Sequence, residues 1–234
     1  MRAALDPLTR FYASSIGKKI LVALTGLVLT IFVLGHMVGN LLVFAGPDAI
    51  NEYGHMLQTV LHGSGVWIAR AGLLLAALIH IICTVQLANA NRRARPEKYG
   101  KKATIVASKA SLTMVISGLT ILTFIIYHLL HFTVHVGNDY ETYTTLLHGE
   151  PVHDVYKMVI AGFSWWPATI FYLIAMALLA FHLSHGVASM FQTLGLATDR
   201  TWPFFKVIGV AYALLIFIGN SAIALAIQVF HYGR

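Results

Sequence analysis

Six histidines lie within long apolar stretches of this sequence, where a polar side chain is costly to bury. They are His36, His80, His128, His131, His182 and His185. Imidazole nitrogens bind metal ions and haem iron, and an ionisable residue inside an apolar span is a candidate functional group by default. One such histidine is equally well explained by a hydrogen bond to a neighbouring helix. Histidines in four successive apolar stretches favour a metal or haem site instead.

These stretches are long enough to cross a membrane. Hydrophobic residues make up 58% of the 234-residue chain, charged residues make up 11%, and the mean hydropathy is +0.74. Mainly apolar segments of the roughly 20 residues that a membrane core requires occur at 20–44, 66–89, 107–135, 166–190 and 204–229. Lipid offers backbone groups no hydrogen-bond partner, and the segments lack the alternation of barrel strands. We therefore predict an all-α integral membrane protein with five transmembrane helices, as a single domain over residues 1–234.

Three other parts of the chain predict short elements at the membrane surface. Residues 1–19 are too polar for the core of a signal peptide and predict an interfacial segment that leads into the first helix. The connections after the first and third helices mix apolar and polar residues at helical spacing. Each connection therefore predicts a short amphipathic helix on the outer surface.

The basic residues lie mainly on one side of the predicted bundle. The formal net charge is +7, and 13 of the 16 Lys and Arg residues lie before the first helix, between the second and third, and between the fourth and fifth. By the positive-inside rule these ends are cytoplasmic, so the N-terminus is inside and the C-terminus outside. Docking of a partner is a second use of the cluster, and nucleic acid is not an expected partner. The cluster between the second and third helices comprises Arg92, Arg93, Arg95, Lys98, Lys101, Lys102 and Lys109.

The histidines fall at two depths in these helices. Counted from the cytoplasmic end of each segment, His36 and His128 lie at roughly 25–29 Å, and His80 and His182 at roughly 15–18 Å. Two pairs at two depths, one histidine from each of four helices, are what two stacked bis-histidine haems need.

Two of the apolar segments carry a second histidine. His131 lies one turn further out than His128, and His185 lies one turn below His182. We prefer His128 and His182 as ligands and keep His131 and His185 as alternatives. A haem propionate is another partner for His185, and lipid headgroups are the expected surroundings of His135.

Other residue types near the histidines agree with a cofactor site. Gly35 and Gly39 flank His36, Gly118 lies in the third segment, and Gly186 follows His182 by one turn. Their missing side chains leave room for a flat macrocycle, although small residues also let transmembrane helices pack closely. All nine Asp and Glu residues lie outside the segments, which argues against a carboxylate proton relay and hence a proton-coupled transporter. The single cysteine excludes an internal disulfide, a cysteine-rich zinc site and c-type haem attachment.

Five stretches carry a family resemblance. They are "FYASSIGKKILVALTGL", "GHMVGN", "GPDAINEYGHMLQ", "IYHLLHFT" and "AFHLSHGVASMFQTLG". Their order and spacing resemble the cytochrome b membrane-anchor subunit of succinate dehydrogenases and fumarate reductases, in its five-helix, two-haem, b558-type form. The resemblance covers nearly the whole chain, from Phe11 to the fifth helix.

The resemblance implies two haem b groups inside the bundle. In that family helices I to IV each supply one ligand, with I pairing III and II pairing IV, which gives His36 with His128 and His80 with His182. The family's third-helix ligand precedes a leucine, as His128 does. Its fourth-helix ligand comes four residues before a glycine, as His182 does before Gly186.

The resemblance also implies the partners and the reaction. The chain would anchor a flavoprotein subunit and an iron–sulfur subunit at the cytoplasmic face of the cell inner membrane. It would pass electrons between the iron–sulfur subunit and menaquinone, or another quinone, without performing succinate chemistry itself. Both directions of the reaction, succinate oxidation and fumarate reduction, occur in the family.

Two other classes are alternatives. A cytochrome b anchor of a hydrogenase or formate dehydrogenase would bind haem, but such anchors usually have four spans and a different histidine layout. A histidine-bearing transporter would carry no pigment and would need no partner subunits.

Three charged or polar residues on the outer side complete the candidate site. Arg70 is a basic residue near the outer end of the second segment, where an outer-haem propionate and lipid headgroups are both suitable partners. Glu52 and His55, in the connection after the first helix, are candidates for proton exchange with a quinone. A glutamate in this connection is the presumed proton acceptor in the resembled family. The competing placement puts the quinone at the inner haem, near Ser15, Lys19 or His185.

Overall fold

The computed structural model describes residues 6–94 and 114–234. The first residues of the third predicted span, 107–113, lie outside the described residues. Six basic residues also lie outside the described residues: Arg2, before the first helix, and Arg95, Lys98, Lys101, Lys102 and Lys109 of the cluster between the second and third helices.

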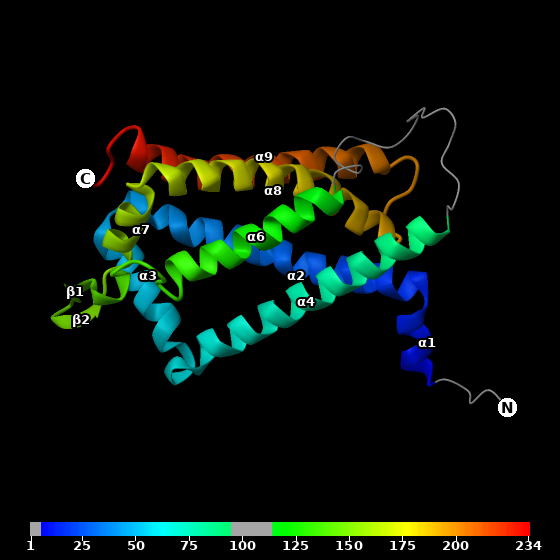
Figure 1. Ribbon diagram of the computed structural model, residues 1–234, viewed down its shortest axis with the longest axis horizontal. Coiled ribbons are helices and arrows are strands. Elements are labelled where there is room, and N and C mark those ends of the chain that lie inside the picture. Colours follow the sequence, from blue (N-terminus) through cyan, green and yellow to red (C-terminus); the bar gives the residue numbers. More distant parts are fainter. Residues whose placement is uncertain (1–5, 95–113) are drawn as a thin grey trace.

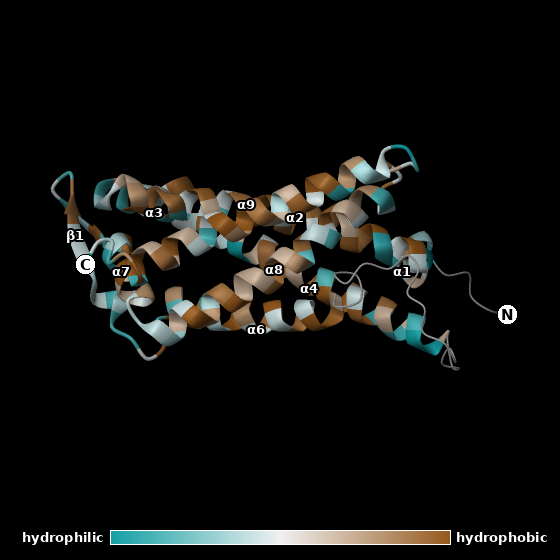
Figure 2. Ribbon diagram, turned by 90° about the horizontal axis from the view of Figure 1, so that it is seen from above, coloured by the Kyte–Doolittle hydropathy of each residue, from teal (hydrophilic) through white to brown (hydrophobic). Residues whose placement is uncertain are grey.

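Five helices of the described chain are long and apolar enough to cross a membrane, as the sequence predicts. They are α2 (Ser15–Leu41), α4 (Ser64–Arg93), α6 (Met114–Phe132), α8 (Trp166–Thr193) and α9 (Trp202–Gln228). Apolar residues line their middle parts, and hydrophilic residues lie towards their ends (Figure 2). The chain is therefore an all-α multi-pass membrane protein in its architecture.

The shorter elements gather at the two ends of this bundle (Figure 1). One end carries α1 (Pro7–Ala13), and we call it the α1 end. The opposite end, which we call the hairpin end, carries η1 (Leu42–Ala45), α3 (Pro47–Thr59), η2 (Val60–Gly63), η3 (Tyr140–Thr142), β1 (Thr144–Leu147), β2 (Glu150–His153), α7 (Val155–Phe163) and the C-terminus.

Local sequence sets where several helices begin. The Ser14 hydroxyl accepts a hydrogen bond from the backbone N–H of Gly17 at 2.8 Å and so caps α2. Helices α3, α8 and α9 each have a proline in the first turn, where its missing N–H costs nothing. Gly46, with φ of 104°, makes the corner between η1 and α3.

Several helices extend beyond or stop short of the predicted apolar segments. Helix α2 begins at Ser15 rather than at residue 20, and α4 continues to Arg93 rather than to residue 89. Hydropathy marks only the part of a helix that lies in lipid, whereas capping and backbone hydrogen bonds continue into the polar flanks. Helix α6 ends at Phe132, before the predicted end at residue 135.

The connection after the third long helix contains the predicted short helix and an element that was not predicted. The helix is α7, and the antiparallel hairpin β1–β2 precedes it. His148 and Gly149 both have positive φ, 52° and 86°, as a two-residue type I′ turn requires. Threonine and valine residues in the strands favour the extended backbone. The connection after the first long helix is helical as predicted, as α3.

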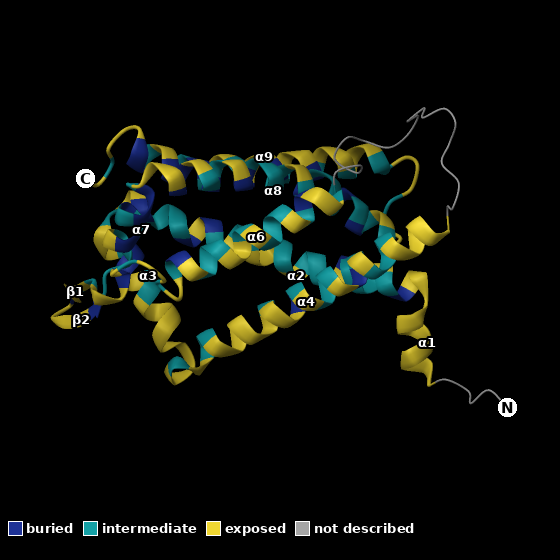
Figure 3. Ribbon diagram, in the orientation of Figure 1, coloured by how far each residue is buried: buried dark blue, intermediate teal, exposed yellow. Residues whose placement is uncertain are grey.

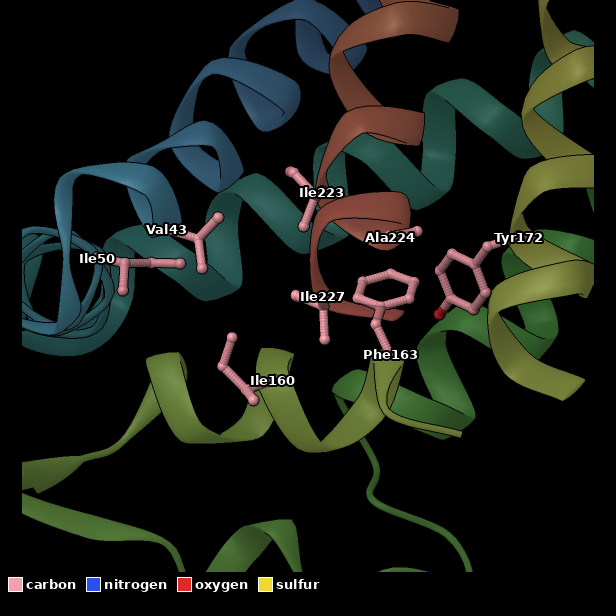
Figure 4. Packing of buried hydrophobic residues seen from close by; sticks show 8 residues of the cluster. All are labelled: Val43, Ile50, Ile160, Phe163, Tyr172, Ile223, Ala224 and Ile227. Atoms are coloured by element: carbon pink, nitrogen blue, oxygen red, sulfur yellow. The ribbon is translucent and has the colours of Figure 1, made fainter. Parts of the chain in front are cut away.

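Helices α8 and α9 pack against each other along their length, and α2 contacts both of them as well as α4. Helix α6 packs on α8. Burial is concentrated on α8, α9 and the hairpin end, whereas α4 has only Ala76 and Cys83 buried (Figure 3). The largest buried cluster joins α7, α8 and α9 to η1 and α3 at the hairpin end (Figure 4).

Candidate functional site

His36 and His128 lie against each other between α2 and α6. Their ring centroids are 5.6 Å apart, and the ring planes are nearly perpendicular, at 87°. The ring of His36 also stacks on Phe32, one turn earlier in α2, at 5.4 Å and 22°. The fold thus brings together two of the four preferred histidines, from helices that are far apart in sequence.

His80, on α4, is anchored to α2 through one ring nitrogen. Its Nδ1 lies 3.2 Å from the Thr25 hydroxyl oxygen. Thr25 donates its only hydroxyl proton to the carbonyl of Leu21 at 2.6 Å, so its oxygen can only accept from the histidine. Nδ1 of His80 therefore carries the proton, and the lone pair of the neutral ring lies on Nε2.

His182, on α8, is anchored to α6 in the same way. Its Nδ1 lies 3.3 Å from the Ser117 hydroxyl, which donates to the carbonyl of Met114 at 3.1 Å. The argument that applies to His80 therefore assigns Nδ1–H to His182 as well. Both hydroxyl residues directly precede a glycine, Gly26 and Gly118, and the ring of each histidine lies over that glycine.

The hydroxyl of Tyr172, on α8, lies within hydrogen-bond distance of both His128 and His131. It lies 3.1 Å from Nδ1 of His128 and 3.3 Å from Nδ1 of His131. Nε2 of His131 is itself 3.3 Å from the hydroxyl of Tyr140, so both of its nitrogens have protein partners. Within residues 6–94 and 114–234, Nε2 of His128 has no hydrogen-bond partner, which favours His128 as the ligand.

His185 also has a partner within its own helix. Its Nε2 lies 3.1 Å from the hydroxyl of Ser189, one turn later in α8. His182 instead directs its Nδ1 to another helix and leaves Nε2 without a hydrogen bond to the described chain. This difference favours His182 over His185 as a metal ligand.

The four preferred histidines lie at two levels of the bundle. His80 and His182 each come 16 residues after the first residue of their helix, or roughly 24 Å along it from the hairpin end. His36 and His128 come five and four residues before the last residue of theirs, or roughly 6–8 Å from the same end. Helices α4 and α8 thus supply one level, and helices α2 and α6 supply the other.

The four candidate glycines differ in their surroundings. A side-chain carbon added at Gly35 or Gly186 would meet no atom of the described chain within 4 Å. One added at Gly118 would lie 3.6 Å from Cε1 of His182. Gly39 instead accommodates the ring of Tyr53, which a side chain there would strike. Gly118 therefore lies against a histidine ring, Gly35 and Gly186 adjoin open space, and Gly39 serves the packing of α3 on α2.

The candidate charged residues lie towards the hairpin end and are exposed. The Arg70 guanidinium lies over the ring of Trp67, 4.9 Å from its centroid. Glu52 and His55 lie on the exposed side of α3. Their neighbour Asn51 is buried instead, and it accepts from the backbone N–H of Tyr156 at 2.9 Å and donates to Asp154 at 3.2 Å. The structure therefore gives Asn51 a packing role and does not bring Glu52 to the histidine pairs.

His153 and Tyr140 are among the titratable groups at the hairpin end whose pKa values are shifted. Burial and the neighbouring His135 lower the pKa of His153, against opposing contributions from the Tyr143 backbone and Asp154. Burial raises the pKa of Tyr140, with smaller contributions from Tyr143, Tyr127 and Asp139. Tyr140 therefore keeps its phenolic proton at neutral pH and remains a hydrogen-bonding partner for His131.

Sequence reasoning did not single out the three residues that anchor the histidines. Thr25, Ser117 and Tyr172 contact histidines from 44 to 65 residues away in the chain. The repeated hydroxyl–glycine pair, Thr25–Gly26 and Ser117–Gly118, was the available signal. It occurs once in each of the two helices that face the deeper histidines.

Comparison of the chain with protein-family models, with curated proteins and with solved structures gave no match. Among the described residues, no group of three or more His, Cys, Asp or Glu side chains is placed to hold a metal ion. What the geometry offers is therefore one imidazole on each of four helices, and three of these imidazoles, those of His80, His128 and His182, have one anchored nitrogen.

Proposed function

We propose that this chain is the di-haem cytochrome b anchor of a succinate:quinone oxidoreductase. The observation that carries the proposal is the arrangement of the histidines: two levels, one histidine from each of four helices, with Nδ1 of three of them held by a hydroxyl. Neutral imidazole binds metal through the nitrogen that its hydrogen bond leaves free. An imidazole pair suits haem, because the porphyrin supplies the other four ligands of the iron.

Some residues of the chain would bind the two haem irons, and others would orient these ligands or leave space for the porphyrin. His36 with His128, and His80 with His182, would be the axial ligands. Thr25, Ser117 and Tyr172 fix the tautomer and orientation of three of them. Gly35, Gly118 and Gly186 leave room for the ring. The bound haems supply one-electron transfer, and the apolar helices around them exclude water and so tune their potentials.

The distribution of charge supports an orientation and a docking face. The α1 end carries Arg92, Arg93, Lys18, Lys19 and Lys206, which the positive-inside rule places in the cytoplasm. An iron–sulfur subunit, with its flavoprotein partner, would dock there, nearest to the His80/His182 level. Electrons would then pass through the second level to a quinone near the hairpin end, or in the reverse direction. Menaquinone is the proposed quinone, and Glu52 or His55 would exchange its protons with water.

The haem content of the intact complex tests this proposal. A reduced-minus-oxidised spectrum and a pyridine haemochrome assay should give two b-type haems per chain, with a flavin and an iron–sulfur subunit co-purifying. His80→Leu and His182→Leu should each lose one haem, whereas the matched variant His185→Leu should keep both. A colourless protein would indicate a transporter, and haem with other partner subunits would indicate the anchor of a different dehydrogenase.

A further inference from the structure

The anchoring groups of the two histidine levels differ chemically. At the deeper level, Thr25 and Ser117 donate their hydroxyl protons to carbonyls of their own helices. At the level near the hairpin end, the hydroxyl of Tyr172 has two imidazole partners and no backbone carbonyl partner in the described chain. Its proton therefore goes to one imidazole while its oxygen accepts from the other.

We propose that Tyr172 is a positioning residue for His128: its oxygen accepts a hydrogen bond from Nδ1–H of His128, and its proton goes to Nδ1 of His131. The inference rests on the proposed haem-binding function. With Nδ1 protonated, His128 has its lone pair on Nε2, as a haem ligand requires. His131 then carries its proton on Nε2, within 3.3 Å of the Tyr140 hydroxyl, which accepts it.

The packing around Tyr172 holds its hydroxyl in this place. The ring is buried, with 7% of its surface exposed. It meets Phe124 and Phe163 edge to face, at centroid distances of 5.1 Å and 5.0 Å. Figure 4 shows the ring beside Phe163 at the edge of the buried cluster. Because two aromatic walls fix the ring, the hydroxyl cannot turn away from the two histidines without moving α8.

The hydrogen bond has a chemical consequence for the iron. An acceptor on Nδ1–H makes the imidazole a stronger electron donor and so favours the oxidised metal. Donation from Tyr172 to His131 polarises the phenol and makes its oxygen a better acceptor. Loss of the Tyr172 hydroxyl should therefore raise the midpoint potential of the haem held by His36 and His128.

The test is a potentiometric titration of both haems in the complex that carries Tyr172→Phe. The haem near the hairpin end should show a higher midpoint potential and an altered low-spin electron paramagnetic resonance spectrum, while the other haem stays unchanged. Tyr127→Phe is the matched control, because the Tyr127 ring packs 6.0 Å from Tyr172 and makes no hydrogen bond through its hydroxyl to the described chain. It should change neither potential.

A second variant keeps the proposal falsifiable if Tyr172→Phe fails to assemble. His131→Phe removes the acceptor of the Tyr172 proton and should raise the same potential by less, with both haems retained. Two haems with unchanged potentials in Tyr172→Phe would overturn this inference alone. Loss of a haem in His131→Phe would overturn the assignment of His128, and an unaltered complex without haem would overturn the proposed function as well.

Discussion

At the residue scale, the second nitrogen of each histidine distinguishes a candidate ligand from a structural histidine. His131 uses both nitrogens for hydrogen bonds, and His185 uses Nε2 for Ser189. His80, His128 and His182 use only Nδ1, each towards a hydroxyl on another helix. The free Nε2 atoms of these half-buried histidines are therefore open to a ligand, whereas the ring nitrogens of His131 are occupied by protein partners.

Thr25→Val and Ser117→Ala should each raise the midpoint potential of the haem that the proposed function assigns to His80 and His182. Each variant removes the acceptor of Nδ1–H without changing a ligand. Redox titration of the complex measures the effect, and the other haem should be unaffected. Thr84→Val is the control, because the Thr84 hydroxyl, one turn after His80 in α4, donates to the backbone carbonyls of His80 and Ile81 rather than to a ring nitrogen. A shift of equal size in Thr84→Val would indicate a general packing effect instead.

At the element scale, the hairpin end is held together by buried polar contacts as well as by apolar packing. Asn51 on α3 bonds to Asp154 and to the backbone of Tyr156, and Asp154 in turn caps α7 by accepting from the N–H of Lys157 at 2.9 Å. The hydroxyl of Tyr232 donates to the Val43 carbonyl at 3.2 Å and ties the C-terminus to η1. These contacts fix the short elements that cover the His36/His128 level.

Asn51→Ala should loosen this region. The change leaves the backbone N–H of Tyr156 and the carboxylate of Asp154 without their buried partner, at a cost of about 1–3 kcal/mol. Limited proteolysis should then cut within residues 140–155 faster than in the unaltered protein, with the long helices intact. Asn89→Ala, at an exposed position of α4, is the matched control and should not change the cleavage rate.

The hairpin should become less stable as the pH is lowered below about 6.5, the ordinary pKa of histidine. Burial and His135 hold the pKa of His153 below that value in the folded state. The unfolded hairpin therefore binds a proton more readily, and the contribution to stability is complete above pH 6.5 and is lost as the pH falls towards the lowered pKa. Protease cleavage of the hairpin at pH 7.5 and pH 5.5 measures this effect. If His153→Gln shows the same pH dependence, another group is responsible.

At the scale of the whole molecule, packing is uneven across the bundle. Nine residues of α8 are buried, compared with two of α4. Helix α4 contacts mainly α2, yet it supplies one of the four preferred histidines. A haem bound between His80 on α4 and His182 on α8 would give α4 packing contacts that it does not have in the protein without haem.

The proposed path of electrons across the molecule ends at a quinone. The variant Glu52→Gln tests at which end of the bundle the quinone binds. If the carboxylate of Glu52 exchanges protons with the quinone, the variant should lose quinone turnover. Both haems should remain, and succinate oxidation with a soluble dye should persist, because the proposed function places that chemistry in another subunit. Full quinone activity in Glu52→Gln would move the quinone site to the α1 end, near Ser15, Lys19 or His185. Asp48→Asn, also on α3, is the matched control.

The sequence alone was enough to predict five long helices, their approximate bounds and the two levels of histidines. These features depend on the length of apolar runs and on the constant rise of a helix, both of which are local. The hairpin was missed because its turn uses His148 and Gly149 instead of the usual Asn–Gly or Asp–Gly signal. Helix ends were displaced because hydropathy follows the lipid and not the backbone hydrogen bonds.

Only the tertiary structure showed which histidine ring nitrogens have a hydrogen-bond partner in the protein and which do not. Thr25 and His80 are 55 residues apart in the chain, and Ser117 and His182 are 65 apart. No periodicity within one helix reports on such a contact. The choice between His128 and His131 likewise depends on a tyrosine from another helix and on the hydroxyl of Tyr140. Sequence places a side chain along its own helix, but only the packing of helices determines which groups meet its hydrogen-bonding atoms.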